Sequence, residues 1–281
     1  MTLSAHSTEL GHFMNNDIER EFNLGGSVDK ALSGSYELKV GDVLKEAWGM
    51  TVKHFINFTP AIFVLIVVQL AIFYLAFKLQ IGDLSVILSV FEQGGTVPEG
   101  LVQAMFIANF SYEVISAPIY AGISLMAMSH AAGLRTQTRH MSKGLQFTIP
   151  VILATLFSLM LQGVAGMILP FLSMYLSIAF SNSLLLICEK KVPPMQSLLL
   201  SLRAANKKIF PLIAIYSVLM VLFIMAVFLY GIGLVLFLPF FFHVKGIIYR
   251  NMFGIRLKII ATDHPKDDQG NLSQSSGVFD A

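Results

Sequence analysis

The chain has 281 residues, of which 55% are hydrophobic and 13% charged, and its mean hydropathy is +0.71. Soluble domains carry roughly a quarter charged residues, so this composition excludes an ordinary soluble globular domain and favours a protein solvated by lipid. The net charge of +2 is too small to suggest nucleic-acid binding, which needs a clustered basic face. The single cysteine, Cys188, cannot form a disulfide within the chain and offers no metal-ligand spacing.

The two ends of the chain are polar and lack hydrophobic periodicity. Residues 1–35 are rich in Gly, Ser and Asn, and they predict a disordered cytoplasmic arm. This arm has no charged start followed by an apolar run, so it is not a secretory signal peptide, and the first apolar span is expected to direct insertion. Residues 262–281 predict a disordered cytoplasmic tail, which leaves residues 36–261 as the membrane domain.

Four apolar runs follow one another between these ends. Thr59–Phe77 and Leu101–Ser129 are each predicted to cross the membrane once, because one crossing needs ~20 residues. Leu145–Ile187 and Ile209–Tyr249 are each roughly twice that length, so each is predicted to form a hairpin of two crossings. The fold class is therefore an all-α integral membrane protein with six spans arranged as three hairpins. Four or five crossings with one re-entrant segment is the alternative.

Glycine and proline interrupt the two long runs near their middles, where a tight hairpin would need them. These residues are Gly163, Gly166 and Pro170 in the first run and Gly231, Gly233 and Pro239 in the second.

The positions of Lys and Arg predict the orientation. Of the 19 basic residues, all but Lys78 lie before the first span, between spans two and three, between spans four and five, or at and beyond the end of span six. Cytoplasmic loops are enriched in Lys and Arg, so both termini are predicted to lie in the cytoplasm.

The odd-numbered spans begin alike, with a cation followed by a proline. The pairs are Lys53 and Pro60, Lys143 and Pro150, and Lys207 and Pro211. Amphipathic stretches at 36–55 and 193–208 precede two of these spans, and such helices lie in the headgroup plane. Trp48 is of the type that anchors at this interface. The pattern predicts three copies of an interfacial helix, an ascending span and a descending span. The alternative is that prolines and lysines simply recur at membrane boundaries.

Residues 170–255 resemble bacterial inner-membrane proteins of the YciC type. The resemblance rests on an apolar span, a short charged loop, a helix with a Ser-x-Arg stretch, a further span and a Gly-rich turn with proline. The matching residues are Ser201, Arg203, Gly231, Gly233 and Pro239. The resemblance implies a multi-pass protein of the bacterial inner (plasma) membrane, and it supplies no biochemical activity.

Signatures of soluble enzymes are absent, so no catalytic residue, cofactor or metal ligand is predicted and the chain is expected not to be an enzyme. Polar side chains within the apolar runs are few. They are Gln69, Asn109, Glu113, Gln162, Asn182, His243 and Lys245.

Two of these residues are candidates for an intramembrane site. Glu113 is the one carboxylate within an apolar span, and a buried carboxylate at depth is a functional candidate because its charged form is costly there. The alternative places it at the interface, hydrated or hydrogen-bonded to Tyr112 or Tyr120. His243 is expected to be hydrogen-bonded structure, with a role beside bound phosphate as the alternative. Lys245 is expected to snorkel to the cytoplasmic headgroups.

A cationic cluster before span five is a candidate contact for anionic lipid headgroups. Its members are Arg203, Lys207 and Lys208. The alternative is an ordinary positive-inside loop with no such role.

The sequence leaves the function open between two classes. A non-enzymatic scaffold or accessory subunit, which binds a partner protein or a lipid in the bilayer, fits the scarcity of intramembrane polar groups. A transporter or lipid-handling protein with a site near Glu113 is the alternative, because Pro/Gly-interrupted helices and repeats are features of transporters. Against transport, the sequence shows no clear pair of broken, polar-lined spans.

Overall fold

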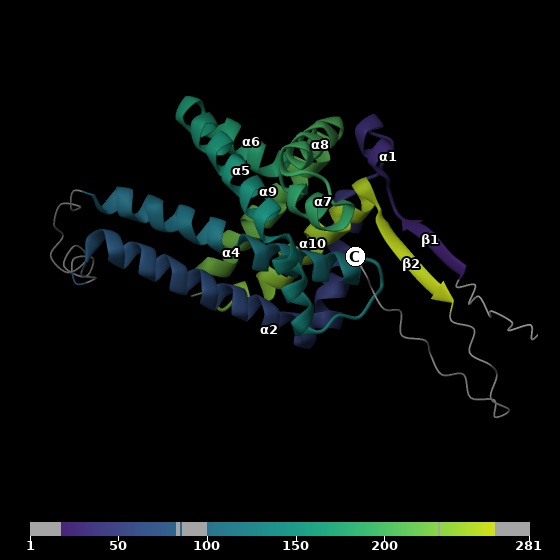
Figure 1. Cartoon of the computed structure of the whole chain (residues 1–281), viewed down its shortest axis with the longest axis horizontal. Coiled ribbons are helices and arrows are strands. Elements are labelled where there is room, and N and C mark those ends of the chain that lie inside the picture. The colour runs from purple at the N-terminus through teal and green to yellow at the C-terminus, as the bar shows by residue number, and fades with distance from the viewer. Residues whose placement is uncertain (1–17, 83–84, 86–99, 230, 262–281) are drawn as a thin grey trace, which may run out of the picture. The chain divides into compact units, whose positions relative to one another are not determined.

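The computed structural model describes residues 18–82, 85, 100–229 and 231–261 (Figure 1). Six of its helical segments are long and apolar enough to cross a membrane. This confirms the predicted all-α membrane fold with six spans.

The described elements occur along the chain in one order. They are β1 (Ile18–Leu24), α1 (Val28–Ser33), α2 (Val40–Ile81), α4 (Leu101–Ala131), the 3₁₀ helix η1 (Thr138–Phe147), α5 (Thr148–Ile168), α6 (Pro170–Ala179), α7 (Ser183–Lys190), α8 (Pro194–Lys207), α9 (Ile209–Phe228), α10 (Leu234–Phe253) and β2 (Ile255–Ala261). Spans one, two, five and six are α2, α4, α9 and α10; span three joins η1 to α5, and span four joins α6 to α7.

Helix α2 runs unbroken for 42 residues, so the prediction of a separate interfacial helix before span one is wrong. The reason is that its buried positions keep one helical phase through Pro60. These positions are Val43, Ala47, Thr51, His54, Phe58, Ala61, Ile62 and Leu65. At about 1.5 Å per residue the helix is roughly 60 Å long, about twice the hydrocarbon thickness, so it extends well beyond one crossing.

The hairpin turns lie where the two long apolar runs were predicted to break, but only some of the predicted glycines and prolines lie in the turns. Only Leu169 separates α5 from α6, and Gly163 and Gly166 lie inside α5. In the second turn Gly231 has a φ of 77°, and a Cβ at Gly233 would lie 2.7 Å from Ala226 Cα. Pro239 lies inside α10, not in the turn.

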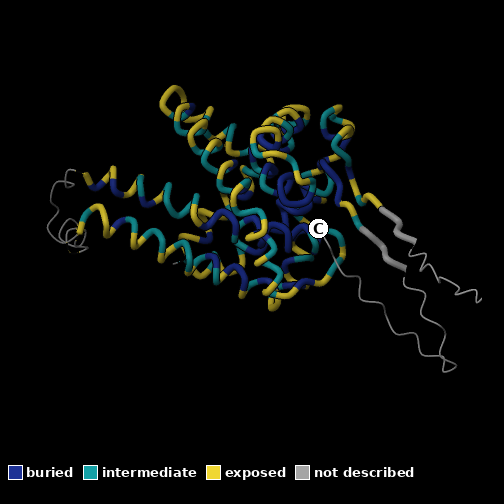
Figure 2. The backbone as a smooth tube through the Cα atoms, viewed as in Figure 1, coloured by how far each residue is buried: buried dark blue, intermediate teal, exposed yellow. Residues whose placement is uncertain are grey.

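Helix α4 is the central helix and is largely buried from Ser116 to Ala131, whereas α5 and α9 contain few buried residues (Figure 2). Backbones approach closely on two sides of α4. A Cβ on Gly122 would overlap the Met141 carbonyl of η1, and a Cβ on Gly246 of α10 would lie 2.8 Å from Ala127 O. Small residues therefore let η1 and α10 pack directly against α4.

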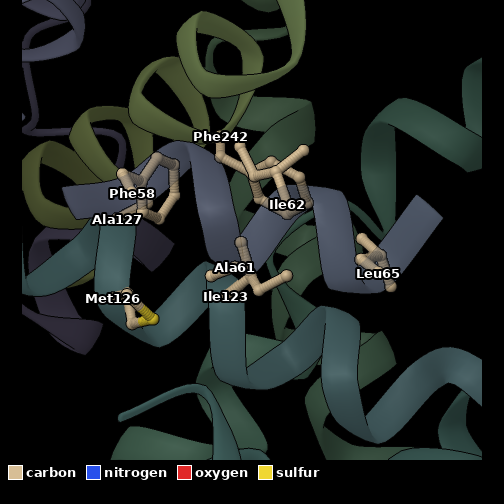
Figure 3. Packing of buried hydrophobic residues seen from close by; sticks show 8 residues of the cluster. All are labelled: Phe58, Ala61, Ile62, Leu65, Ile123, Met126, Ala127 and Phe242. Atoms are coloured by element: carbon tan, nitrogen blue, oxygen red, sulfur yellow. The ribbon is translucent and has the colours of Figure 1, made fainter. Parts of the chain in front are cut away.

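A hydrophobic cluster joins α2, α4 and α10 (Figure 3). Its buried members are Phe58, Ala61, Ile62, Leu65, Ile123, Met126, Ala127 and Phe242.

Part of the predicted disordered arm has secondary structure, which corrects that prediction for residues 18–35. Strands β1 and β2 pair in a two-stranded sheet, so the predicted membrane domain also ends in a strand. Helix α1 is capped by Ser27, whose Oγ accepts from Lys30 N at 3.2 Å, and it buries Ala31. A lone short strand is unstable in water, so β1 and β2 need each other, and local sequence could not show this pairing. Residues 1–17 and 262–281 lie outside the described residues.

The side chain of Tyr36 connects the segment that follows α1 with helix α8. Its hydroxyl donates to Ala204 O at 2.7 Å, although the two residues are 168 positions apart. Burial raises the pKa of Tyr36 to about 12. The phenol therefore stays neutral at physiological pH and keeps its donor proton.

Candidate functional site

A cavity of about 390 Å³ lies among α2, α4, α5, span four and α10. Although these segments are apolar overall, most of the residues that line the cavity carry a polar side chain. The polar lining residues are Gln69, Tyr112, Glu113, Ser116, Tyr120, Thr155, Ser158, Gln162, Ser177, Ser181, Ser183 and Lys245. A polar cavity at membrane depth is costly for a fold to maintain, so it is the candidate functional site.

Helix α4 supplies one wall of the cavity from a single face. Glu113, Ser116, Ala117 and Tyr120 are spaced at i, i+3, i+4 and i+7, the positions that share one side of a helix. The small side chain of Ala117 leaves space between the carboxylate at one end of this face and the phenol at the other.

Hydrogen bonds orient the polar groups of this wall. Asn109 Nδ2 donates to Glu113 Oε1 at 3.2 Å. Gln69 Nε2 of α2 donates to Ser116 Oγ at 3.1 Å. Glu113 is half-buried and forms no hydrogen bond with Tyr112 or Tyr120 in the described part of the chain, so the predicted interfacial alternative with those partners is not what the structure shows.

Lys245 reaches the cavity from α10 with 6% of its surface exposed. Its ammonium donates to Tyr120 Oη at 2.8 Å and lies 4.7 Å from the centre of the Tyr120 ring and 5.8 Å from that of Phe241. The prediction that it snorkels to the cytoplasmic headgroups is therefore wrong, because the side chain turns inward towards a hydroxyl and two aromatic rings.

No carboxylate lies within 4 Å of the Lys245 ammonium among the residues that the structure describes. The three ion pairs found there join Lys39 to Glu37, Lys190 to Glu189 and Arg250 to Glu46. Glu113 shares the cavity with Lys245 but does not pair with it. Lys245 is consequently a buried cation that faces an open space without a counter-ion.

Span four is broken beside the cavity, between Ala179 and Ser183. Ser201 of α8 compensates part of the lost helical bonding, because its Oγ donates to Ala179 O at 2.5 Å and accepts from Asn182 N at 3.3 Å. One span is therefore broken beside a polar site, whereas no pair of broken, polar-lined spans was expected from the sequence. The residues of the break gave no glycine or proline as a signal.

One side-chain atom at this break, Asn182 Oδ1, is buried without a hydrogen-bond partner in the described part of the chain. Ser181, which belongs to the cavity lining, interacts instead with the Tyr216 hydroxyl. A buried polar group left unpaired costs free energy, so the break is maintained at an energetic cost.

His243 does not line the cavity and takes part in a separate hydrogen-bonded chain. Its Nδ1 lies 3.0 Å from Thr51 Oγ1, and its Nε2 lies 2.9 Å from His130 Nδ1. His130 Nε2 lies 2.7 Å from Thr136 Oγ1. The ring of His54 stacks on that of His130, with the centroids 3.9 Å apart. This hydrogen-bonded chain of side chains thus joins α2, α4 and α10. Of its residues, only His243 was a candidate from the sequence.

The direction of every bond in this chain follows from one hydroxyl. Thr51 Oγ1 donates its proton to Ala47 O at 2.8 Å, so it can only accept from His243 Nδ1. With neutral imidazoles, His130 Nδ1 then donates to His243 Nε2, and Thr136 donates to His130 Nε2.

No group of three or more His, Cys, Asp or Glu suited to a metal occurs among the described residues.

The candidate lipid contacts lie apart from the cavity, at the end of α8. Arg203 and Lys207 are exposed and Lys208 is half-buried. The amphipathic stretch predicted at 193–208 forms α8, but its leucines do not share one environment, because Leu198 is buried while Leu199 is exposed. The buried face consists mostly of small residues: Ser197, Ser201, Ala204 and Ala205.

Comparison of the chain with protein-family models, with curated proteins and with solved structures finds no match. The geometry of the cavity is therefore the basis for a functional proposal.

Proposed function

We propose that this chain is a non-enzymatic, lipid-handling membrane protein whose cavity binds an anionic group against Lys245. The observation that carries the proposal is the buried ammonium, which faces a polar cavity without a counter-ion. Burying an unpaired charge is expensive, and ionisable groups at membrane depth commonly mark ligand sites. A bound anion would supply the missing charge.

The surroundings of the cavity favour an amphipathic ligand. On α5, Ser158 and Gln162 line the cavity, whereas Met160 and Val164 each expose 61% of their surface. The α5–α6 hairpin and the α2–α4 pair diverge from each other (Figure 1). A lipid can therefore place its headgroup among the polar side chains while its acyl chains follow the exposed apolar face.

The proposal includes a location in a bacterial inner membrane with both termini in the cytoplasm. It is supported by the one-sided distribution of Lys and Arg along the sequence and by the resemblance of residues 170–255 to inner-membrane proteins of the YciC type.

The test replaces Lys245 by methionine, which keeps the length of the buried side chain and removes its charge. The wild-type protein, Lys245→Met and the control Lys78→Met are purified in mild detergent, and the lipids they retain are quantified by native mass spectrometry. Lys78 is exposed and lies outside the cavity lining. We expect Lys245→Met to retain about tenfold less bound lipid than the other two proteins, since losing one partner of a buried charged contact weakens binding strongly.

Equal lipid retention by Lys245→Met and the wild type, with both folded by thermal melting, would overturn the proposal. Retention of a small soluble anion in place of lipid would overturn the lipid assignment and favour transport of a solute. A stoichiometric protein that co-purifies without any lipid would favour the scaffold or accessory role that the sequence also allows.

A further inference from the structure

We propose that the ligand of this cavity is zwitterionic, with its anionic group against Lys245 and an ammonium group against Glu113. The inference rests on the proposed function, because it specifies the chemistry of a ligand already assigned to Lys245. A phospholipid headgroup that carries a primary amine, such as phosphoethanolamine, has both charges.

The cavity has one positive and one negative side chain in its lining. Lys245 and Glu113 are the two lining residues of opposite charge, and the lining contains no other Asp, Glu, Lys or Arg. They are not paired within 4 Å. A ligand with only a negative charge would leave the carboxylate uncompensated and would be repelled by it. A ligand that carries both charges compensates both side chains and adds no net charge to the membrane interior.

The two charged ends of the cavity lie apart along helix α4. Glu113 lies seven residues, or about 10 Å of helix rise, from Tyr120, whose hydroxyl accepts from Lys245. The negative and positive ends of the cavity are therefore separated along one wall. Ser116 lies between them on this wall, and Ser158 lines the cavity from α5. A ligand that spans this distance would meet hydroxyl groups between its two charges.

Each charged side chain of the cavity has hydrogen-bonding capacity that its protein partners do not use. Asn109 donates to Oε1 of Glu113, which leaves Oε2 as an acceptor for a ligand ammonium within the described part of the chain. At the other end, Lys245 uses one of its three donor protons on Tyr120. Both groups thus keep hydrogen-bonding capacity that faces the cavity.

The test compares two lipids that share a phosphate and differ in the amine. Native mass spectrometry measures binding of phosphatidylethanolamine and phosphatidylglycerol, offered at equal concentration, to the delipidated full-length protein. We expect the wild type to prefer phosphatidylethanolamine by about tenfold, because a charge-assisted contact at depth is lost with the other lipid. Glu113→Gln, which keeps an oxygen for Asn109, should reduce this preference to about twofold or less without weakening phosphatidylglycerol binding.

Glu37→Gln is the matched control, since Glu37 is exposed and lies outside the cavity lining. Its preference should equal that of the wild type. A parallel arm adds soluble glycerophosphoethanolamine as a competitor. Competition as strong as that of the intact lipid supports zwitterionic chemistry with a free solute as the source, whereas weak competition supports the same chemistry with a lipid as the source.

The outcomes separate this inference from the proposed function. If the wild type binds both lipids equally, Glu113→Gln changes nothing and Lys245→Met abolishes binding, the zwitterion is overturned while the anion site stands. If Lys245→Met binds both lipids as the wild type does, the proposed function itself is overturned.

Discussion

Single side chains of His and Thr link three of the spanning helices. The chain from Thr51 through His243 and His130 to Thr136 runs in one direction, and each of its bonds joins groups that are buried. Because the bonds share one direction, removing the Thr51 acceptor takes one hydrogen bond from the buried His243 imidazole, which also bonds the Pro239 backbone. The role that this geometry supports for His243 is structural.

Thr51→Val tests this role at the scale of one residue. Valine has the shape of threonine, but it cannot accept from His243 Nδ1, so we expect the loss of one hydrogen bond to lower stability by about 0.5–1.5 kcal/mol. The loss should appear as a lower melting temperature in detergent. Thr138→Val removes a hydroxyl whose hydrogen bond to Asn57 O is long, at 3.5 Å, and exposed, so it should leave the melting temperature nearly unchanged. Equal melting temperatures for both variants and the wild type would contradict the structural role.

The close approach of backbones at glycine residues determines how η1 packs against α4. Helix η1 lies against α4 where Gly122 and Gly144 face each other, and a Cβ on either glycine would overlap backbone atoms of the opposing segment. By contrast, a Cβ on Gly163 of α5 would meet no atom within 4 Å. Glycine is therefore required at the first contact and is replaceable at Gly163.

Gly122→Ala and Gly163→Ala make a matched pair at the scale of elements. We expect Gly122→Ala to lower stability by about 1–3 kcal/mol, because the added methyl must push η1 away from α4. Gly163→Ala should be neutral or stabilising by up to about 1 kcal/mol, since alanine favours a helix over glycine. Thermal melting in the same detergent measures both. A smaller loss for Gly122→Ala than for Gly163→Ala would show that the contact is not as close as described.

The whole molecule has a predicted orientation that labelling can test. Wild-type protein provides the blank, because its one cysteine, Cys188, is fully buried. Lys78→Cys, at the end of α2, should react with a membrane-impermeant maleimide added to intact cells. Lys39→Cys, before α2, should react only after the membrane is permeabilised, because cations gather on the cytoplasmic side. The reverse pattern would contradict the predicted topology, and reaction of both positions in intact cells would contradict a membrane crossing between them.

At this scale too, local sequence predicted the elements but not all of their boundaries. Apolar length alone predicted six spans, and the break after Ile168 followed from the proline at 170. The separate helix expected before span one was wrong because the buried face of α2 continues past Pro60, and that face is defined by its contacts with α4 and α10. Strands β1 and β2 escaped prediction because they come from opposite ends of the chain.

The sequence by itself determined the all-α membrane class, the number of spans and the four charged and amide side chains of the cavity lining. Gln69, Glu113, Gln162 and Lys245 stood out because polar residues are rare in apolar runs. Only the tertiary structure decided that these four meet, that Lys245 turns inward to Tyr120, and that span four breaks beside them. The physical reason is that apolar length is a local property of the chain. Which faces of five segments converge depends instead on packing between residues far apart in sequence.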